Sequence, residues 1–129
     1  GGGEPALRSR FISSFRSICP PLWKINIETS LNVPAEHLER LLPVIDEFVI
    51  DIKDMNPFIY REYTGLDNAR VIKNLKLISC AGKADRCLIR IPLIPDYNTD
   101  EDRARSIADL EALGFTRFDK FEYKTDINK

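Results

Sequence analysis

The chain has 129 residues, enough for one domain or part of one, with 43% hydrophobic and 30% charged residues. Nineteen Lys and Arg nearly balance twenty Asp and Glu, and no basic run stands out, so composition gives no reason to expect a nucleic acid or an anionic membrane as partner. The apolar runs are far too short for a membrane span, and we expect no secretory leader.

Three cysteines, Cys19, Cys80 and Cys87, stand at wide and irregular spacing. Their odd number argues against a disulfide framework, and their spacing argues against a closed zinc site. We therefore expect reduced thiols in a cytoplasmic protein, with Cys87 in the core. The only histidine, His37, falls in a polar helix start, a position that does not favour a catalytic or metal-binding role.

Helical and strand patterns alternate along the chain. Apolar residues spaced three or four apart, with capping signals, predict helices, whereas strict alternation predicts strands. The first helix, 6–18, carries Leu7, Phe11, Phe15 and Ile18 on one face. In chain order the predicted elements are a helix over 6–18, a strand over 21–30, a helix from 34, a strand over 46–53, a helix over 67–80, a strand over 86–95, a helix from 99 to 114 and a strand over 117–124.

This alternation predicts an α/β fold built from βα units with about four parallel strands. Helices on both faces of the sheet would make it doubly wound, whereas helices on one side would make it part of a barrel. Each strand has one continuous apolar face, and its other face becomes charged only toward the carboxyl end. This pattern favours helices on one side.

Four charged residues share the face opposite the apolar one. They are Glu28, Asp51, Lys53 and Arg90, on three successive strands. In βα barrels the ligand site lies at the carboxyl ends of the strands, so we expect these side chains to converge. Two acids and two bases suit a zwitterionic ligand, because acids bind an ammonium group or a cation and bases bind a carboxylate. The opening "GGGEP" precedes a helix as a strand-end loop does, and we place it at the same rim.

Five short motifs give the chain a family resemblance. They are "GGEP" at 2–5, "IETS" at 27–30, "DIK" at 51–53, "YTGLDNARVIKNL" at 63–75 and "RIPLIPDYN" at 90–98. Because these motifs occur in this order, the chain resembles the radical S-adenosylmethionine enzymes that activate glycyl radical enzymes, such as pyruvate formate-lyase activating enzyme. The resemblance covers nearly the whole chain and implies the C-terminal part of a partial (β/α)6 TIM-like barrel, with residues 1–129 as a single fragment of it.

The resemblance also implies roles for residues. Gly2, Gly3 and Glu4 would bind the amino group of S-adenosylmethionine, partly through backbone carbonyl groups. Glu28, Asp51 and Lys53 would lie by the carboxylate of the cofactor, where a monovalent cation can bridge Glu28 and Asp51, and Arg90 would also reach the cofactor. These last four are the residues that strand alternation places together.

Three positions depart from the family pattern. Leu31 and Asp96 stand where the family usually has glycine, after "ETS" and after "IP". Lys124 stands where a family histidine near the cofactor ribose would align. The two loops and the ribose contact are therefore expected to differ from those of the family.

The family holds a [4Fe–4S] cluster with a CxxxCxxC motif that precedes "GGEP", and this sequence has no such spacing. We therefore expect a fragment that lacks the N-terminal cluster-binding part, is inactive alone and self-associates along its open edge. The parent would cleave S-adenosylmethionine reductively and take a hydrogen atom from a glycine of its partner. The implied partners are a glycyl radical enzyme and an electron donor such as flavodoxin or ferredoxin.

Two alternatives stay open on the residues alone. One is a βα-barrel aldolase or sugar-phosphate enzyme domain that uses Lys53 as an amine nucleophile. The other is a non-catalytic domain that binds a protein or a ligand through the exposed face of the sheet.

Overall fold

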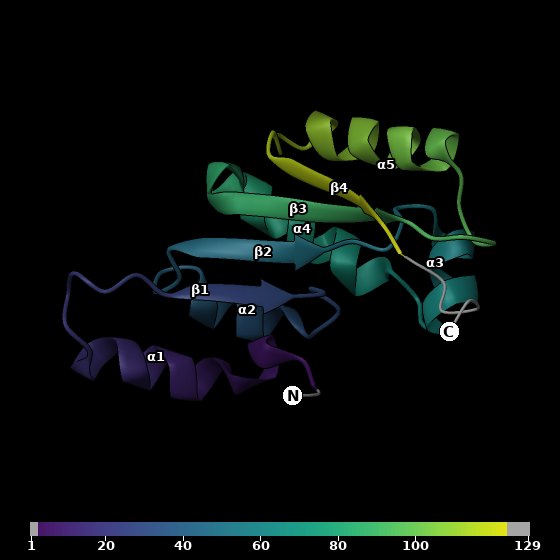
Figure 1. Ribbon diagram of the computed structural model, residues 1–129. Coiled ribbons are helices and arrows are strands. Elements are labelled where there is room, and N and C mark those ends of the chain that lie inside the picture. The colour runs from purple at the N-terminus through teal and green to yellow at the C-terminus, as the bar shows by residue number, and fades with distance from the viewer. Residues whose placement is uncertain (1–2, 124–129) are drawn as a thin grey trace, which may run out of the picture.

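A computed structural model describes residues 3–123 and contains a single four-stranded sheet (Figure 1). The strands are β1 (Asn26–Thr29), β2 (Glu47–Asp51), β3 (Cys87–Leu93) and β4 (Phe118–Glu122). They lie in the order β1-β2-β3-β4, and every neighbouring pair is parallel. The predicted parallel sheet is therefore confirmed.

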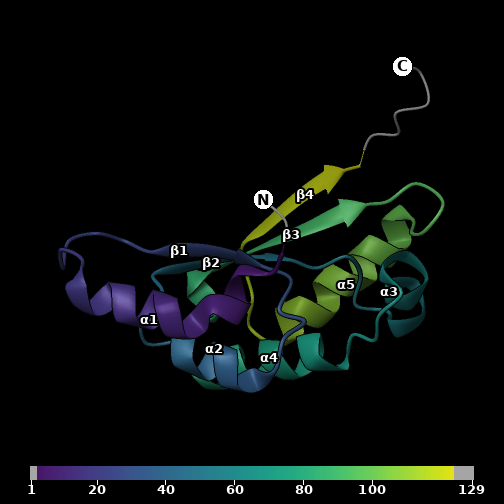
Figure 2. The same cartoon turned by 90° about the horizontal axis from the view of Figure 1, so that it is seen from below.

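The helices gather on one face of this sheet, as Figure 2 shows. They are the 3₁₀ helices η1 (Pro5–Arg8) and η2 (Ala84–Arg86) and the α-helices α1 (Ser9–Ile18), α2 (Ala35–Leu41), α3 (Pro57–Thr64), α4 (Ala69–Cys80) and α5 (Asp100–Ala112). The predicted one-sided arrangement is confirmed. Within residues 3–123, no helix has the length and apolar character needed to cross a bilayer.

The core lies between the sheet and the helices. Phe48 and Ile50 of β2 and Ile89 of β3 point to the helical side and are completely buried, against Leu75 of α4. Cys87 is also buried, as the sequence predicts, and burial raises the pKa of its thiol to about 12. The helices thus cover one face of the sheet, and the opposite face of each strand is left for other contacts.

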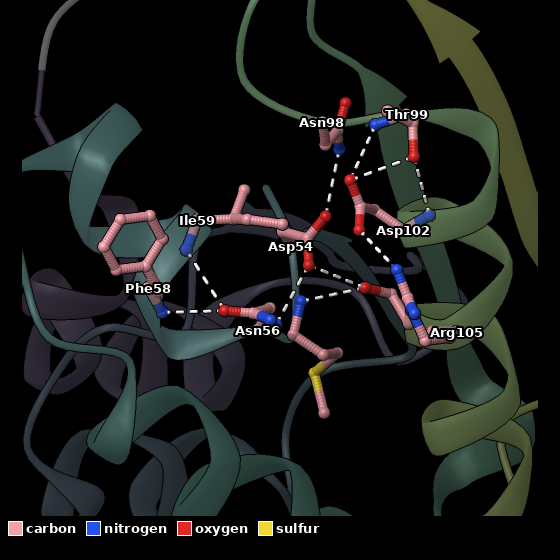
Figure 3. Close-up of polar contacts among 10 residues, drawn as sticks. Asp54, Asn56, Phe58, Ile59, Asn98, Thr99, Asp102 and Arg105 are labelled. Carbon is pink, nitrogen blue, oxygen red and sulfur yellow. Dashed lines mark hydrogen bonds and ion pairs between the residues drawn. The ribbon is translucent and has the colours of Figure 1, made fainter.

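Helix α3 is absent from the sequence prediction. Asn56 caps it by accepting hydrogen bonds from the backbone N–H groups of Phe58 and Ile59 (Figure 3), and Pro57 occupies its first turn. Gly65 ends it in the left-handed conformation, with φ of 76°. All three signals are present in the sequence, but a helix of eight residues shows too little periodicity to be recognised by pattern alone.

The predicted first helix is split, and its apolar stripe faces outward. η1 passes directly into α1, which packs on α2 through Ser9, whose hydroxyl lies 2.8 Å from His37 Nδ1 and accepts a hydrogen bond from Arg40. His37 thus has a structural contact. On the other side of α1, Phe11 and Ile18 are 70% and 80% exposed. Strand β1 is an edge strand of the sheet.

Within residues 3–123, two loop residues other than glycine have positive φ. They are Leu31, at 61°, and Asp96, at 72°. These are the positions at which the family resemblance predicts glycine, and the structure shows why, because a side chain is strained in the left-handed region. Leu31 is only 1% exposed, so burial of its side chain offsets the strain, whereas Asp96 is exposed and has no such compensation.

We expect Asp96→Gly to stabilise the protein. Relief of the left-handed strain gains roughly 1–2 kcal/mol, and the extra backbone entropy of glycine costs about 0.5–1 kcal/mol, so the free energy of unfolding should rise by about 0.5 kcal/mol. Leu31→Gly is the matched variant: loss of a buried leucine costs about 2–5 kcal/mol and outweighs the same relief. Urea unfolding of both variants measures these changes, and a destabilised Asp96→Gly would contradict the strain argument.

Candidate functional site

The charged residues of the open face lie side by side across three strands and form a charged row. Asp51 of β2 pairs with Arg90 of β3, which pairs with Asp119 of β4. Lys53 follows β2 and shares the face of Asp51 by alternation. The structure therefore places Asp51, Lys53 and Arg90 together on the open face, as the sequence predicts, but only Asp51 ends its strand, whereas Arg90 is in the middle of β3 and Asp119 is near the start of β4.

Lys53 is fixed on two sides. Its ammonium donates a hydrogen bond to Asp51 Oδ2 at 2.8 Å and another to the hydroxyl of Tyr123, and it lies 5.0 Å from the centre of the Tyr123 ring. Burial lowers the pKa of Lys53, but the hydrogen bonds to Asp51 and Tyr123 outweigh it, so the pKa is raised. A lysine held as ammonium is a poor amine nucleophile, and this geometry does not support the aldolase reading.

Asp51 keeps one oxygen without a partner. Its Oδ2 accepts from Lys53, whereas its Oδ1 is buried and has no hydrogen-bond partner within residues 3–123. A buried carboxylate oxygen without a donor is costly. The atom is therefore a ready acceptor for a cation or an ammonium group of a ligand.

Arg90 is held by strand β4. Its Nε lies 3.2 Å from Asp119 Oδ2, and its guanidinium carbon lies 4.4 Å from the centre of the Phe121 ring. The remaining guanidinium nitrogens carry no hydrogen bond to other residues within 3–123 in this geometry. Arg90 thus keeps donors for a carboxylate, as guanidinium groups commonly do.

Aromatic side chains stand beside the charged row. The Tyr63 ring lies 4.9 Å from that of Tyr97 and 6.2 Å from that of Tyr123, which in turn lies 5.2 Å from Phe121. Neither these aromatic residues nor Asp119 were predicted as site residues from the sequence. Alternation along β4 was the available signal, because Asp119, Phe121 and Tyr123 share one parity.

Glu28 lies on the same face but outside the charged row. It pairs with Val49, two residues before Asp51, and its side chain is exposed. Within residues 3–123 it makes no side-chain hydrogen bond or ion pair with the row. In that part of the chain no group of three His, Cys, Asp or Glu side chains is arranged to hold a metal ion.

Glu4 holds its own loop to the end of β1. Its Oε1 accepts hydrogen bonds from the backbone and the hydroxyl of Ser30, at 2.8 and 2.7 Å, and its Oε2 accepts from Thr29 Oγ1 at 2.7 Å and from Ala6 N at 2.9 Å. All these donors belong to the protein, so the carboxylate positions the turn. Gly3 has φ of 102°, a conformation that requires glycine. The predicted site residue Gly2, and Lys124, which aligns with the family histidine, lie outside the described residues.

We expect Glu4→Gln to destabilise the protein by about 1–3 kcal/mol. The amide nitrogen of the glutamine side chain would face hydrogen-bond donors and cannot accept from them, so part-buried donors would lose their acceptor. Glu28→Gln is the matched control, since the exposed Glu28 side chain should change stability by less than about 0.5 kcal/mol. Thermal unfolding measures both variants. Equal stabilities for the two would show that the four contacts of Glu4 contribute nothing.

Comparison with known proteins gives the same family as the motifs. A model of the Radical SAM superfamily matches residues 1–110. The chain is 36% identical over 116 residues to (2S)-3-sulfopropanediol dehydratase activating enzyme of Klebsiella oxytoca, covering 88% of this chain and 36% of that protein. It is 32% identical over 114 residues to indoleacetate decarboxylase activating enzyme of Tractidigestivibacter scatoligenes, covering 86% of this chain and 35% of that protein.

Solved structures share the fold. A domain of pyruvate-formate lyase-activating enzyme from Bacteroides vulgatus matches with a TM-score of 0.60 and 18% identity, over 93% of this chain and 95% of that one. Streptococcus suis SuiB matches with a TM-score of 0.71 and 19% identity, over 98% of this chain and 29% of that one. The chain spans about a third of the length of the curated relatives it matches. It belongs to the Radical SAM superfamily, and its homologues include glycyl radical enzyme activating enzymes.

Proposed function

We propose that this chain forms the S-adenosylmethionine-binding part of an activating enzyme for a glycyl radical enzyme, pyruvate formate-lyase or a relative. The observation that carries the proposal is the row of Asp51, Lys53 and Arg90 on adjacent parallel strands, with one buried oxygen of Asp51 that has no partner within residues 3–123. This row offers cations to a carboxylate and an acceptor to a cation or an ammonium group.

Each end of the cofactor's amino-acid portion has a candidate partner. Backbone carbonyl groups of the turn at Gly2, Gly3 and Glu4 accept from the ammonium group, while the Glu4 side chain keeps that turn against β1. Lys53 and Arg90 donate to the carboxylate. A monovalent cation between Asp51 and Glu28 would use the free Asp51 Oδ1, and Glu28 would have to turn toward it.

The remaining chemistry belongs to the parent protein. There, a [4Fe–4S] cluster would supply the electron for reductive cleavage of S-adenosylmethionine, and the parent would take a hydrogen atom from a glycine of the partner. This chain's residues orient the cofactor and exclude water from it. A cytoplasmic location and a flavodoxin or ferredoxin electron donor complete the proposal.

The chain alone is proposed to be inactive. Cys19 follows α1, Cys80 ends α4 and Cys87 starts β3. A cluster needs thiolates from a common site, whereas these cysteines lie on separate elements and the Cys87 thiol is buried with a pKa of about 12. Catalysis therefore requires cysteines from another part of the parent.

Binding of S-adenosylmethionine to the 129-residue chain tests the proposed function. We expect weak binding, with chemical shift changes at the ends of β2 and β3 in an NMR titration. Lys53→Met should lower the affinity about tenfold, the effect of losing one charged hydrogen bond. Lys76→Met, at an exposed position on α4, is the matched control and should bind like the wild type. Unperturbed strand ends at millimolar ligand, or equal affinities for the two variants, would refute the assignment.

The outward stripe of α1 and the open edge at β1 support self-association of the chain. Phe11 and Ile18 of α1 are 70% and 80% exposed and β1 is an edge strand, and exposed apolar surface together with an unpaired edge favours pairing between copies. We expect Phe11→Glu to shift the chain toward monomer in sedimentation experiments over a range of concentrations. Phe58→Glu is the matched control, since Phe58 is 71% exposed but lies on α3. A monomeric wild type, or an equal effect of both variants, would exclude this interface.

A further inference from the structure

A buried carboxylate directly follows Lys53 and takes no part in the charged row. Asp54 is 1% exposed, and both of its oxygens accept hydrogen bonds from the protein (Figure 3). Oδ1 accepts from Asn56 N at 2.9 Å and from Ser106 Oγ at 3.0 Å, and Oδ2 accepts from Asn98 Nδ2 at 3.0 Å. Burial of a carboxylate is unfavourable unless such donors compensate it.

These donors come from three segments of the chain. Asn56 belongs to the loop after β2, Asn98 to the loop after β3, and Ser106 to α5. Ser106 Oγ also accepts from Met55 N at 3.0 Å, so α5 holds the same loop twice. Asp54 therefore joins the two loops that leave the site strands.

Asn98 extends this connection into the loop after β3. Its Oδ1 accepts from Ile94 N at 2.7 Å, and its Nδ2 also donates to Pro92 O at 3.2 Å. This loop contains Asp96, whose φ is positive, and Tyr97, whose ring lies 4.9 Å from that of Tyr63. A strained turn persists only where its surroundings fix it, and the Asn98 contacts supply that constraint.

We infer that Asp54 is a positioning residue for the carboxylate-binding half of the site. It contacts no part of the charged row itself, but it fixes the backbone one residue after Lys53 and ties it to the loop after β3. Lys53 and strand β3, which carries Arg90, are thereby held at a constant separation. The inference rests on the proposed function, because it concerns how this site meets the carboxylate of its ligand.

Asp54→Asn tests the inference with two ligands. An amide at position 54 places a donor against Asn98 or Ser106, so we expect the affinity for S-adenosylmethionine to fall about tenfold, as for one hydrogen bond to a charged group. The affinity for 5′-methylthioadenosine, which lacks the amino-acid portion, should stay unchanged. A merely structural role would weaken both ligands equally, and that result would overturn the inference.

Two further variants sharpen this test. Asp102→Asn is the matched control, because Asp102 caps α5 and pairs with Arg105 without touching Asp54 (Figure 3), and it should affect neither ligand selectively. Asp54→Asn combined with Asn98→Asp restores an amide donor opposite a carboxylate and should recover part of the lost affinity. Failure of this recovery would contradict the Asp54–Asn98 contact as the cause.

Amide hydrogen exchange provides a measurement without ligand. In Asp54→Asn the amides of Met55, Asn56 and Ile94 should exchange about tenfold faster, whereas Asp102→Asn should leave them unchanged. Ser106→Ala serves if Asp54→Asn does not fold; it removes one donor to Asp54 and also the acceptor of Met55 N–H, so faster exchange at Asn56 is the measure of the Asp54 contact in that variant. If the wild type binds neither ligand, the proposed function fails, but hydrogen exchange still tests whether Asp54 connects the two loops. Unchanged exchange at all three amides in Asp54→Asn would show that it does not.

Discussion

The structure depends on one constraint, the alternation of side chains in a parallel sheet that is covered on one side only. Because the helices bury one face, residues such as Phe48, Ile50 and Ile89 must be apolar, and the residues between them are free to be polar. The register of the parallel pairs then sets Asp51 beside Arg90 and Arg90 beside Asp119. The charged row is thus a consequence of how the core is built.

The alternation rule also marks the limit of what the sequence predicts. It places Glu28 on the correct face, but parity carries no information on register, and Glu28 pairs two residues before Asp51. The outward stripe of α1 shows a similar limit. Periodicity identifies the apolar face of a helix, but the contact of Ser9 with α2 decides which face turns inward. Long-range partners such as Tyr123 for Lys53 carry no local signal at all.

The two positive-φ residues show how one backbone requirement permits different side chains. Leu31 gains enough from burial to offset left-handed strain, and its loop is also held by Asn74, which donates to the carbonyl groups of Leu31 and Val33. Asp96 has no burial to offset its strain, but Asn98 anchors its loop from two sides. Departure from glycine is therefore tolerated where neighbouring contacts already determine the turn.

Glu4 and Asp54 both hold loops in place, although each lies in or next to a motif that the family resemblance associates with ligand binding. Glu4 belongs to the GGEP motif and Asp54 directly follows the DIK motif, and both carboxylates accept hydrogen bonds from donors of the protein, four for Glu4 and three for Asp54. Each ties a strand-end loop to a neighbouring segment. Asp51, with one buried oxygen free, differs from both. The number of protein donors that reach a carboxylate in or beside such a motif therefore indicates whether it binds the ligand or holds a loop. A carboxylate whose two oxygens already accept hydrogen bonds from the protein acts on the ligand only through the backbone that it positions.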